Sequence, residues 1–146
     1  MTLEEIQTYQ LAMDLGERVW VIVDRWNYFA KDTVGKQLVK AADSVAANIS
    51  EGYGRFFYKE NKQFCYYSRG SLFETKTWLT KGHNRRLITD DEFSSFQKDL
   101  NTIGIKLNNY INSIGTQKQP HQKDQSSQSK KVSSKTKQND PMTRSK

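Results

Sequence analysis

The chain has 146 residues, of which 35% are hydrophobic, and it carries a formal net charge of +7. This length predicts a single domain. The single cysteine, Cys65, excludes an internal disulfide framework and is typical of proteins of the reducing cytoplasm. The longest unbroken apolar run, residues 19–23, is far too short to cross a bilayer, and no cationic leader precedes an apolar stretch. We therefore expect a soluble, cytoplasmic protein.

Composition divides the chain near residue 115. Residues 115–146 contain no aromatic residue and only two aliphatic or sulfur-containing residues, Val132 and Met142. Such a segment cannot bury enough apolar surface to offset the entropy lost on ordering, so we predict that it is disordered. Its eight Lys and Arg residues and two Asp residues give it a charge of +6, which leaves +1 for residues 1–114. A basic tail of this kind is attracted to any polyanion, or it only makes the chain more soluble.

Residues 1–51 predict two amphipathic helices. The first spans Thr2 to about residue 26, because its apolar residues recur at alternating steps of three and four. Thr2 and Glu5 have the spacing of a capping box, which favours a start at Thr2. The second helix spans residues 33–51 and is narrow because it is rich in alanine. Gly52 and Gly54 follow it and supply backbone freedom for a stop and a turn.

Two further helices complete residues 1–114. The third spans residues 59–81, and small hydroxyl residues in its inner stripe would let it approach the alanines of the second helix closely. A basic turn follows. The fourth helix begins at Thr89, where Glu92 completes a second capping box, and its apolar residues step by three and four as far as Ile114. Four amphipathic helices with short connections predict an all-α, antiparallel up-down four-helix bundle.

A small set of polar residues falls on helix faces that the pattern assigns to the core. Asn48 shares a stripe with Val45, and a buried amide must find hydrogen-bond partners. We predict a structural network that fixes the register of the second and third helices, with Arg55 nearby to balance its charge. The network consists of Asn48, Glu51, Ser71 and Glu74. The alternative is a polar pocket that binds or cleaves a ligand.

The sequence offers no convincing catalytic or metal-binding set. Di-iron bundles place a histidine three residues after a glutamate, and His83, in a predicted solvated turn, has no glutamate at that spacing. Zinc needs more cysteines and histidines than the chain provides. Cys65 has no candidate base in its own helix, and no glycine-rich phosphate loop occurs. We therefore expect a non-enzymatic protein without a metal or a cofactor.

Basic residues are concentrated in the middle of the chain, and eight of them are candidates for contacting nucleic acid. Lys59, Lys62 and Arg69 fall on roughly one side of the third helix, and aromatic residues interleave with charges over residues 53–58. Phosphate contacts combined with stacking on exposed bases are a known way to hold nucleic acid. The eight candidates are Lys36, Lys40, Arg55, Lys59, Lys62, Arg69, Arg85 and Arg86.

Two segments resemble a known family. They are Asn48–Arg55, which reads Asn-Ile-Ser-Glu-Gly-Tyr-Gly-Arg, and Ser71–Glu74, which reads Ser-Leu-Phe-Glu. Both are similar to segments of the four-helix-bundle proteins encoded within intervening sequences of bacterial 23S ribosomal RNA genes. That family in turn resembles the accessory protein of diversity-generating retroelements, a basic homopentamer that works with a reverse transcriptase and nucleic acid. The resemblance implies a homopentameric bundle, RNA or DNA as a partner, no enzymatic activity, and a structural role for the matching polar residues.

Three functions remain open at this point. The first is a homo-oligomer that binds RNA or DNA through its basic surface and tail. Self-association is expected because the three tryptophans and the aromatic cluster of residues 53–58 exceed what one slender core can enclose. The second is a protein-interaction scaffold, for example for a reverse transcriptase. The third is an enzyme acting through Asn48, Glu51 and Glu74, which would require a ligand or a metal at those side chains.

Overall fold

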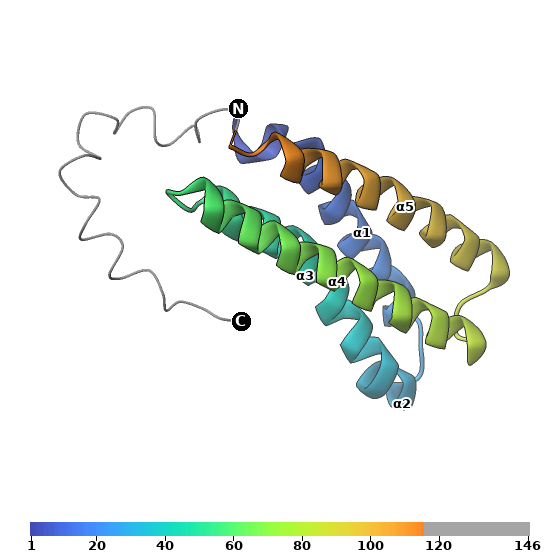
Figure 1. The fold of residues 1–146 in the computed structure, drawn as a ribbon. Helices are drawn as coiled ribbons and strands as arrows, with labels where there is room; N and C mark the ends of the chain where they lie inside the picture. The colour runs from blue at the N-terminus through green and yellow to red at the C-terminus, as the bar shows by residue number, and fades with distance from the viewer. Residues whose placement is uncertain (116–146) are drawn as a thin grey trace.

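The computed structural model describes residues 1–115, which form a bundle of four long helices (Figure 1). These are α1 (Gln7–Asp24), α3 (Lys36–Tyr53), α4 (Tyr58–Asn84) and α5 (Asp90–Ser113). Three short elements complete this part: the 3-10 turn η1 (Leu3–Glu5), the helix α2 (Tyr28–Ala30) and the π-helical turn η2 (Lys31–Gly35). No β-strand occurs within the described residues, and the predicted all-α fold is confirmed. Beyond Gly115, the predicted basic tail lies outside them.

Contacts between helices show that neighbours run in opposite directions. On the seam between α3 and α4, the Ser68 hydroxyl donates to the carbonyl of Val45 over 2.7 Å. Gly52, further along α3, lies instead against Asn61, which comes earlier in α4. A residue that comes later on one helix therefore meets one that comes earlier on the other. Figure 1 shows the same reversal for each consecutive pair of long helices.

The core combines aliphatic stripes of α1, α3 and α5 with a more polar stripe of α4. The α4 stripe contains three polar residues with an exposed fraction of 0%: Asn61, Ser68 and Thr75. Ser68 bonds the Val45 carbonyl and Asn61 lies against Gly52, so two of these side chains lie where α3 and α4 approach closely, as predicted. Ser71 and Trp78, which the periodicity also assigns to the inner stripe, are only half-buried, because the stripe runs through Leu72 and Leu79 beside them.

The two predicted capping boxes have different outcomes. At the start of α5, the Glu92 N–H donates to the Thr89 hydroxyl and the Thr89 N–H donates to the Glu92 carboxylate, over 3.1 and 3.0 Å, so this helix start is confirmed. At the N-terminus, the Thr2 N–H donates to the Glu5 carboxylate over 3.0 Å, but the capped element is only η1. Ile6 follows with an extended backbone that buries its side chain, and α1 begins after it. The prediction of one continuous helix from Thr2 is therefore wrong.

The second long helix begins earlier than predicted. Asn27 caps it, because the Asn27 side-chain oxygen accepts a hydrogen bond from the Ala30 N–H over 3.0 Å. From there α2, η2 and α3 follow one another without a break, since the junction residues keep right-handed helical dihedral angles. Gly35 lies where η2 meets α1, and a Cβ there would come within 2.7 Å of the Val23 side chain. The sequence pattern missed this start because the cap lies outside the alanine-rich stripe.

The predicted stop is present, since α3 ends at Tyr53 with Gly54 as its C-cap, but neither Gly52 nor Gly54 has a left-handed backbone. Gly52 lies within α3, and Gly54 has a φ of −77°. Among the described residues, positive φ occurs only at Arg86 and Gly115. Gly52 is required for a different reason: a Cβ there would lie 2.6 Å from the Asn61 Oδ1 atom and 2.8 Å from the Asn61 carbonyl oxygen. The absence of a side chain therefore lets the end of α3 touch the beginning of α4.

Several large apolar side chains remain exposed on the bundle. One group, which we call the α1–α2 patch, has exposed fractions between 58% and 78% and consists of Trp20, Val21, Tyr28 and Phe29. On α4 and α5, Phe73 is 59% and Ile105 is 64% exposed. Exposed aromatic side chains are therefore present as expected, but of the residues named in the prediction only Trp20 is among them. Trp26, Trp78 and the aromatic residues of the 53–58 cluster are half-buried.

Candidate nucleic-acid interface

The solvent side of α4 carries alternating basic and aromatic residues. They follow steps of four and three, which put side chains on one helix face. We call this set the exposed α4 stripe; it consists of Lys62, Tyr66, Arg69, Phe73 and Lys76, of which Lys62 is half-buried and the other four are exposed. Tyr66 is 49% and Phe73 is 59% exposed. The three cations form no ion pair with any residue of the described range. The exposed stripe is therefore a cationic surface with accessible rings.

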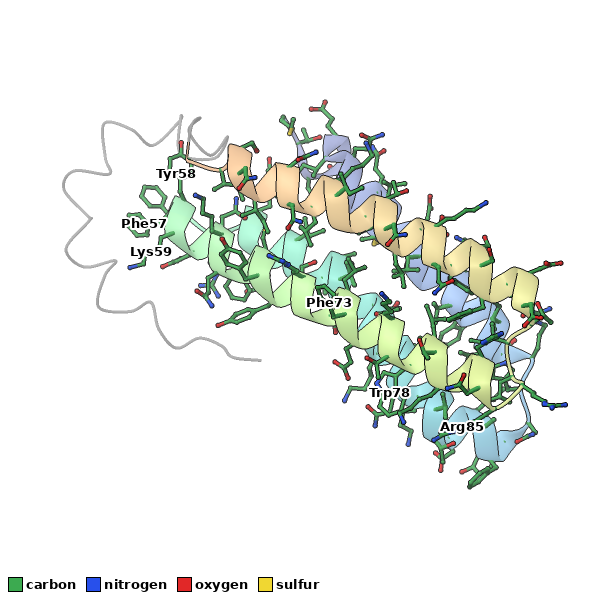
Figure 2. The ribbon with its side chains drawn as sticks, turned by 45° about the vertical axis from the view of Figure 1, so that its right-hand side comes forward. Phe57, Tyr58, Lys59, Phe73, Trp78 and Arg85 are labelled. Atoms are coloured by element: carbon green, nitrogen blue, oxygen red, sulfur yellow. The ribbon has the colours of Figure 1, made fainter. Side chains whose placement is uncertain are left out.

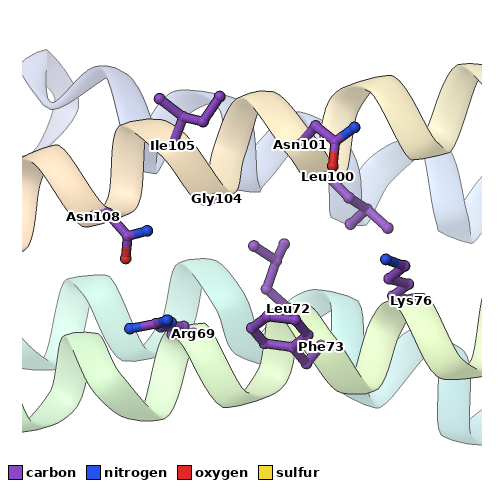
Figure 3. Close-up of a pocket in the computed structure, with 9 residues that line it drawn as sticks. All are labelled: Arg69, Leu72, Phe73, Lys76, Leu100, Asn101, Gly104, Ile105 and Asn108. Atoms are coloured by element: carbon purple, nitrogen blue, oxygen red, sulfur yellow. The ribbon is translucent and has the colours of Figure 1, made fainter.

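The exposed α4 stripe borders a groove between α4 and α5 (Figure 3). This α4–α5 groove has a volume of about 210 Å³. The buried residues Leu72 and Leu100 contribute to its lining, and Gly104 has no side chain to fill it. Figure 3 shows the exposed side chains that surround it: Arg69, Phe73 and Lys76 from α4, and Asn101, Ile105 and Asn108 from α5. No acidic residue lines the groove, so the charged side chains of its lining, Arg69 and Lys76, are both cationic.

Two of the eight predicted cations are engaged by neighbours. The Arg55 guanidinium lies 3.2 Å from the Glu51 carboxylate and 4.8 Å from the centre of the Phe64 ring. Arg55 therefore balances the charge of Glu51, as expected from the sequence, and ties the end of α3 to α4. Lys36 pairs with Asp32 over 3.0 Å. A phosphate would have to displace an existing partner at either position.

The other predicted cations lie on separate parts of the bundle. Lys40, together with Lys36, borders a second groove of about 290 Å³ between α1 and α3. Lys59 continues the exposed α4 stripe by one step toward the start of the helix. Arg85 lies at the opposite end of α4 from Lys59, as Figure 2 shows, and Arg86 follows in the turn. Since α4 has 27 residues and is therefore about 40 Å long, the eight candidates do not form one compact site.

The predicted polar network between the second and third helices does not form within residues 1–115. Its members instead bond locally, four positions apart, over 2.9, 3.2 and 3.3 Å: Asn48 with Ser44, Glu51 with Arg55, and Glu74 with Trp78. Asn48 and Ser71 are half-buried and Glu74 is exposed. The buried stripes run through Ile49 on α3 and Leu72 on α4. The residues of the predicted network lie beside these stripes around each helix axis and not on them.

A different polar cluster occupies the end of the bundle where α4 begins and α5 ends. The Cys65 thiol donates to the Asn61 side-chain oxygen over 3.6 Å, and Asn61 also bonds the Tyr110 hydroxyl. Burial raises the pKa of Cys65 to about 12 and the pKa of Tyr110 to about 12. A thiol with so high a pKa is protonated at neutral pH and is a poor nucleophile. Cys65 is therefore a core residue.

His83 differs from the solvated turn residue that the sequence predicts. The helix α4 extends to Asn84, so His83 lies in its last turn and is half-buried. The His83 Nε2 atom lies 2.7 Å from the Asp90 carboxylate, and the His83 ring stacks on Phe93 with 4.3 Å between ring centres. These contacts join the end of α4 to the beginning of α5.

The acidic residues at the start of α5 serve the helix. The hydrogen bond from the Thr89 backbone lowers the pKa of Glu92 against the opposing effect of burial, and Arg25 adds to the lowering.

Across residues 1–115, no three His, Cys, Asp or Glu side chains are grouped so that they could hold a metal ion. In that same range, no helix has both the length and the apolar character needed to cross a membrane.

Comparison with known proteins identifies the family. Residues 4–109 match the model of the 23S rRNA-intervening sequence protein family. The chain belongs to this family. Among solved structures, it is similar to a protein of unknown function from the S23 ribosomal protein family of Bacteroides thetaiotaomicron VPI-5482, with 18% sequence identity and a TM-score of 0.64. That similarity covers 71% of this chain and 97% of the other, and at this identity it shows the fold alone. None of the curated proteins matches.

Sequence reasoning missed three members of the exposed α4 stripe and two residues across the groove. The spacing of Tyr66, Phe73 and Lys76 from the predicted Lys62 and Arg69 is visible in the sequence and could have found the first three. The α5 amides, Asn101 and Asn108, gain significance only when α5 packs beside α4. No signal in the sequence of this 23S rRNA-intervening sequence family member marks them.

Proposed function

We propose that this protein is a non-enzymatic accessory protein that binds RNA or DNA through the exposed α4 stripe. The observation that carries the proposal is the composition of the stripe: three cations without an ion-pair partner among residues 1–115, separated by two exposed aromatic rings. Cations contact phosphates regardless of sequence, and exposed rings stack on bases. The name of the family makes the RNA of a 23S rRNA-intervening sequence the natural first ligand to test.

The spacing of the cations suits an extended polyanion. Lys62, Arg69 and Lys76 are seven residues apart, which corresponds to about 10.5 Å along the helix axis. At about 3.4 Å per phosphate along one strand, each interval spans about three nucleotides. Because these side chains have no acidic partner among the described residues, a phosphate does not have to displace one. Arg55 and Lys36 lack this advantage.

We also propose that the α1–α2 patch joins copies of the chain into a homo-oligomer, and the resemblance to the retroelement accessory protein favours a pentamer. The patch presents four large side chains, each more than half exposed, and such surfaces commonly mark interfaces. Trp20 borders the groove between α1 and α3, which is separate from the groove between α4 and α5. Association there leaves the exposed α4 stripe free and repeats it in every copy. Gel filtration with light scattering of the native chain and of a Trp20→Ala, Phe29→Ala variant tests this, since the variant should be smaller.

The nucleic-acid proposal is tested by a salt-titrated binding assay with an intervening-sequence RNA. The variant Arg69→Gln, Lys76→Gln should bind more weakly at low salt, and its slope of log affinity against log salt should be shallower by about 1.4. The matched control is Lys36→Gln, Lys40→Gln, which removes the same charge from the groove between α1 and α3. Equal losses in both variants would indicate attraction to net charge alone and would refute a site on α4.

A separate variant tests in this assay whether the predicted basic tail binds nucleic acid. A full-length chain in which the tail Lys and Arg residues are replaced by Gln removes the tail charge and leaves the described residues unchanged. If the proposal is correct, this chain still binds, and the Arg69→Gln, Lys76→Gln change still weakens it. Complete loss of binding on neutralising the tail would show that the tail, and not the exposed α4 stripe, binds nucleic acid.

A second function is favoured by the α1–α2 patch. A scaffold for another protein, such as a reverse transcriptase, would use the same exposed rings for its partner rather than for self-association. Co-purification of a candidate reverse transcriptase with the native chain, lost in the Trp20→Ala, Phe29→Ala variant, would favour the scaffold. It would do so only if that variant kept its oligomeric state and if nucleic acid did not bind.

A further inference from the structure

We infer that the α4–α5 groove holds an unpaired nucleobase, so that this protein prefers single-stranded RNA or DNA to a duplex. The inference rests on the proposed function and specifies which form of nucleic acid the site takes. It combines three properties of the groove: an apolar lining with an exposed ring, a polar rim without acids, and a small volume.

The apolar part of the groove matches the face of a base. Leu72 and Leu100 are each 6% exposed within the lining, while Phe73 and Ile105 are more than half exposed. In a duplex the base faces are stacked on one another inside the helix and cannot reach such side chains. A single strand presents its base faces, and each stacked base contributes substantially to the affinity of proteins that bind single-stranded nucleic acid. Exposed apolar groups beside cations therefore fit an unpaired strand.

The polar rim matches the remaining chemistry of a nucleotide. Arg69 and Lys76 lie about one turn on either side of Phe73, so a strand with a base on the Phe73 ring passes a cation on each side of that base (Figure 3). The exposed side chains of Asn101 and Asn108 each offer donors and an acceptor, which suit the hydrogen-bonding edge of an unpaired base. An acidic peptide would find the cations, but the amides and the apolar lining would have no equivalent partner.

The size of the groove limits what enters it. Its volume of about 210 Å³ is below the roughly 300–1,000 Å³ of pockets that enclose drug-sized ligands. The groove thus accommodates one ring system of a longer molecule. Gly104 keeps this space open, because a Cβ there would lie 3.6 Å from a Leu72 methyl carbon and would occupy part of it.

The test compares one sequence as single-stranded RNA, as single-stranded DNA and as a blunt RNA duplex, each bound to the full-length chain. Phe73→Ala should weaken binding of both single strands by about 5- to 150-fold and leave the duplex affinity unchanged. Phe73→Trp keeps an aromatic ring at this position and should keep the affinity of the native chain for both single strands. The control is Tyr67→Ala, which removes a 46% exposed ring from α4 outside the stripe. It should change neither the affinity for single strands nor the affinity for the duplex. Because Phe73 is largely exposed, circular dichroism and light scattering should show an unchanged fold and oligomer.

The outcomes separate this inference from the proposed function. If Arg69→Gln, Lys76→Gln weakens every nucleic acid but Phe73→Ala weakens none, nucleic-acid binding by the stripe stands and the base-binding groove is refuted. If neither variant has an effect, both ideas fail. Competition by an oligoglutamate peptide as effective as a single strand of equal charge would assign the groove to acidic peptides. A smaller oligomer in Phe73→Ala would assign it to another copy of the chain.

Discussion

Gly52→Ala should destabilise the bundle because the end of α3 touches α4 at this position. The new Cβ would lie 2.6 and 2.8 Å from two oxygen atoms of Asn61 and 3.0 Å from the Phe64 Cβ. The Asn61 carbonyl belongs to the helix backbone and cannot rotate away, so the helices have to separate. Overpacking of this kind costs about 1–3 kcal/mol, whereas replacing glycine by alanine in a helix gains up to about 1 kcal/mol. We expect a net loss of about 0–2 kcal/mol.

Gly70→Ala provides the matched control, because Gly70 lies within α4 and a Cβ there meets nothing within 4 Å. It should stabilise the chain by about 1 kcal/mol. The propensity gain is common to both variants, so the stability difference between them isolates the contact and should be about 1–3 kcal/mol. Urea unfolding at one fixed protein concentration measures it, since association shifts apparent stability. A Gly52→Ala variant as stable as Gly70→Ala would show that the close approach of α3 and α4 is not real.

Three further changes test other contacts. Ser68→Ala removes a buried 2.7 Å hydrogen bond to Val45 and should lower the free energy of unfolding by about 1 kcal/mol in the same urea assay. The pKa of Glu92 is lowered from about 4.5 in the folded chain, so its stabilisation is present above that pH and is lost as the pH falls through the folded value. Glu92→Gln should therefore lower stability at pH 7 and make its decline below pH 4.5 shallower; an unchanged acid profile would contradict the cap to Thr89. Burial and a neighbouring carboxylate raise the pKa of Asp43, so its charged form is disfavoured in the folded chain, and Asp43→Asn should raise the melting temperature slightly at pH 7 but not at pH 3.

The sequence predicted the architecture well where periodicity and capping agree. The helix α5 is the clearest case, because its apolar steps of three and four and its Thr89 cap both specify one face and one start. The start of the second helix was missed because Asn27 lies before a π-helical turn that breaks the regular spacing. The break at Ile6 was missed because a capping box specifies where a helix starts but not how long that helix is.

The candidate site was only partly predictable for a geometric reason. The helix α4 carries two sets of residues with steps of three and four, one through Ser68 and Leu72 and the other through Arg69 and Phe73. The first set is buried and the second is exposed, which depends on where α3 and α5 pack. The buried set holds no charged residue, so the sequence could place Lys62 and Arg69 outside, but it did not show that α5 packs beside them. An error of one position around α3 placed Asn48 in a network that the structure does not form.

The separation of these two faces of α4 has an evolutionary consequence. The face toward α3 is constrained by steric fit, since a single added methyl group at Gly52 would meet the backbone carbonyl oxygen of Asn61. The face that carries Arg69 and Phe73 is open to solvent, where most substitutions change stability by less than about 0.5 kcal/mol. Substitutions on the exposed face are therefore expected to disturb the scaffold beneath it less than substitutions on the seam. Divergence among family members should concentrate on this surface and spare the alanine and glycine positions of the seam.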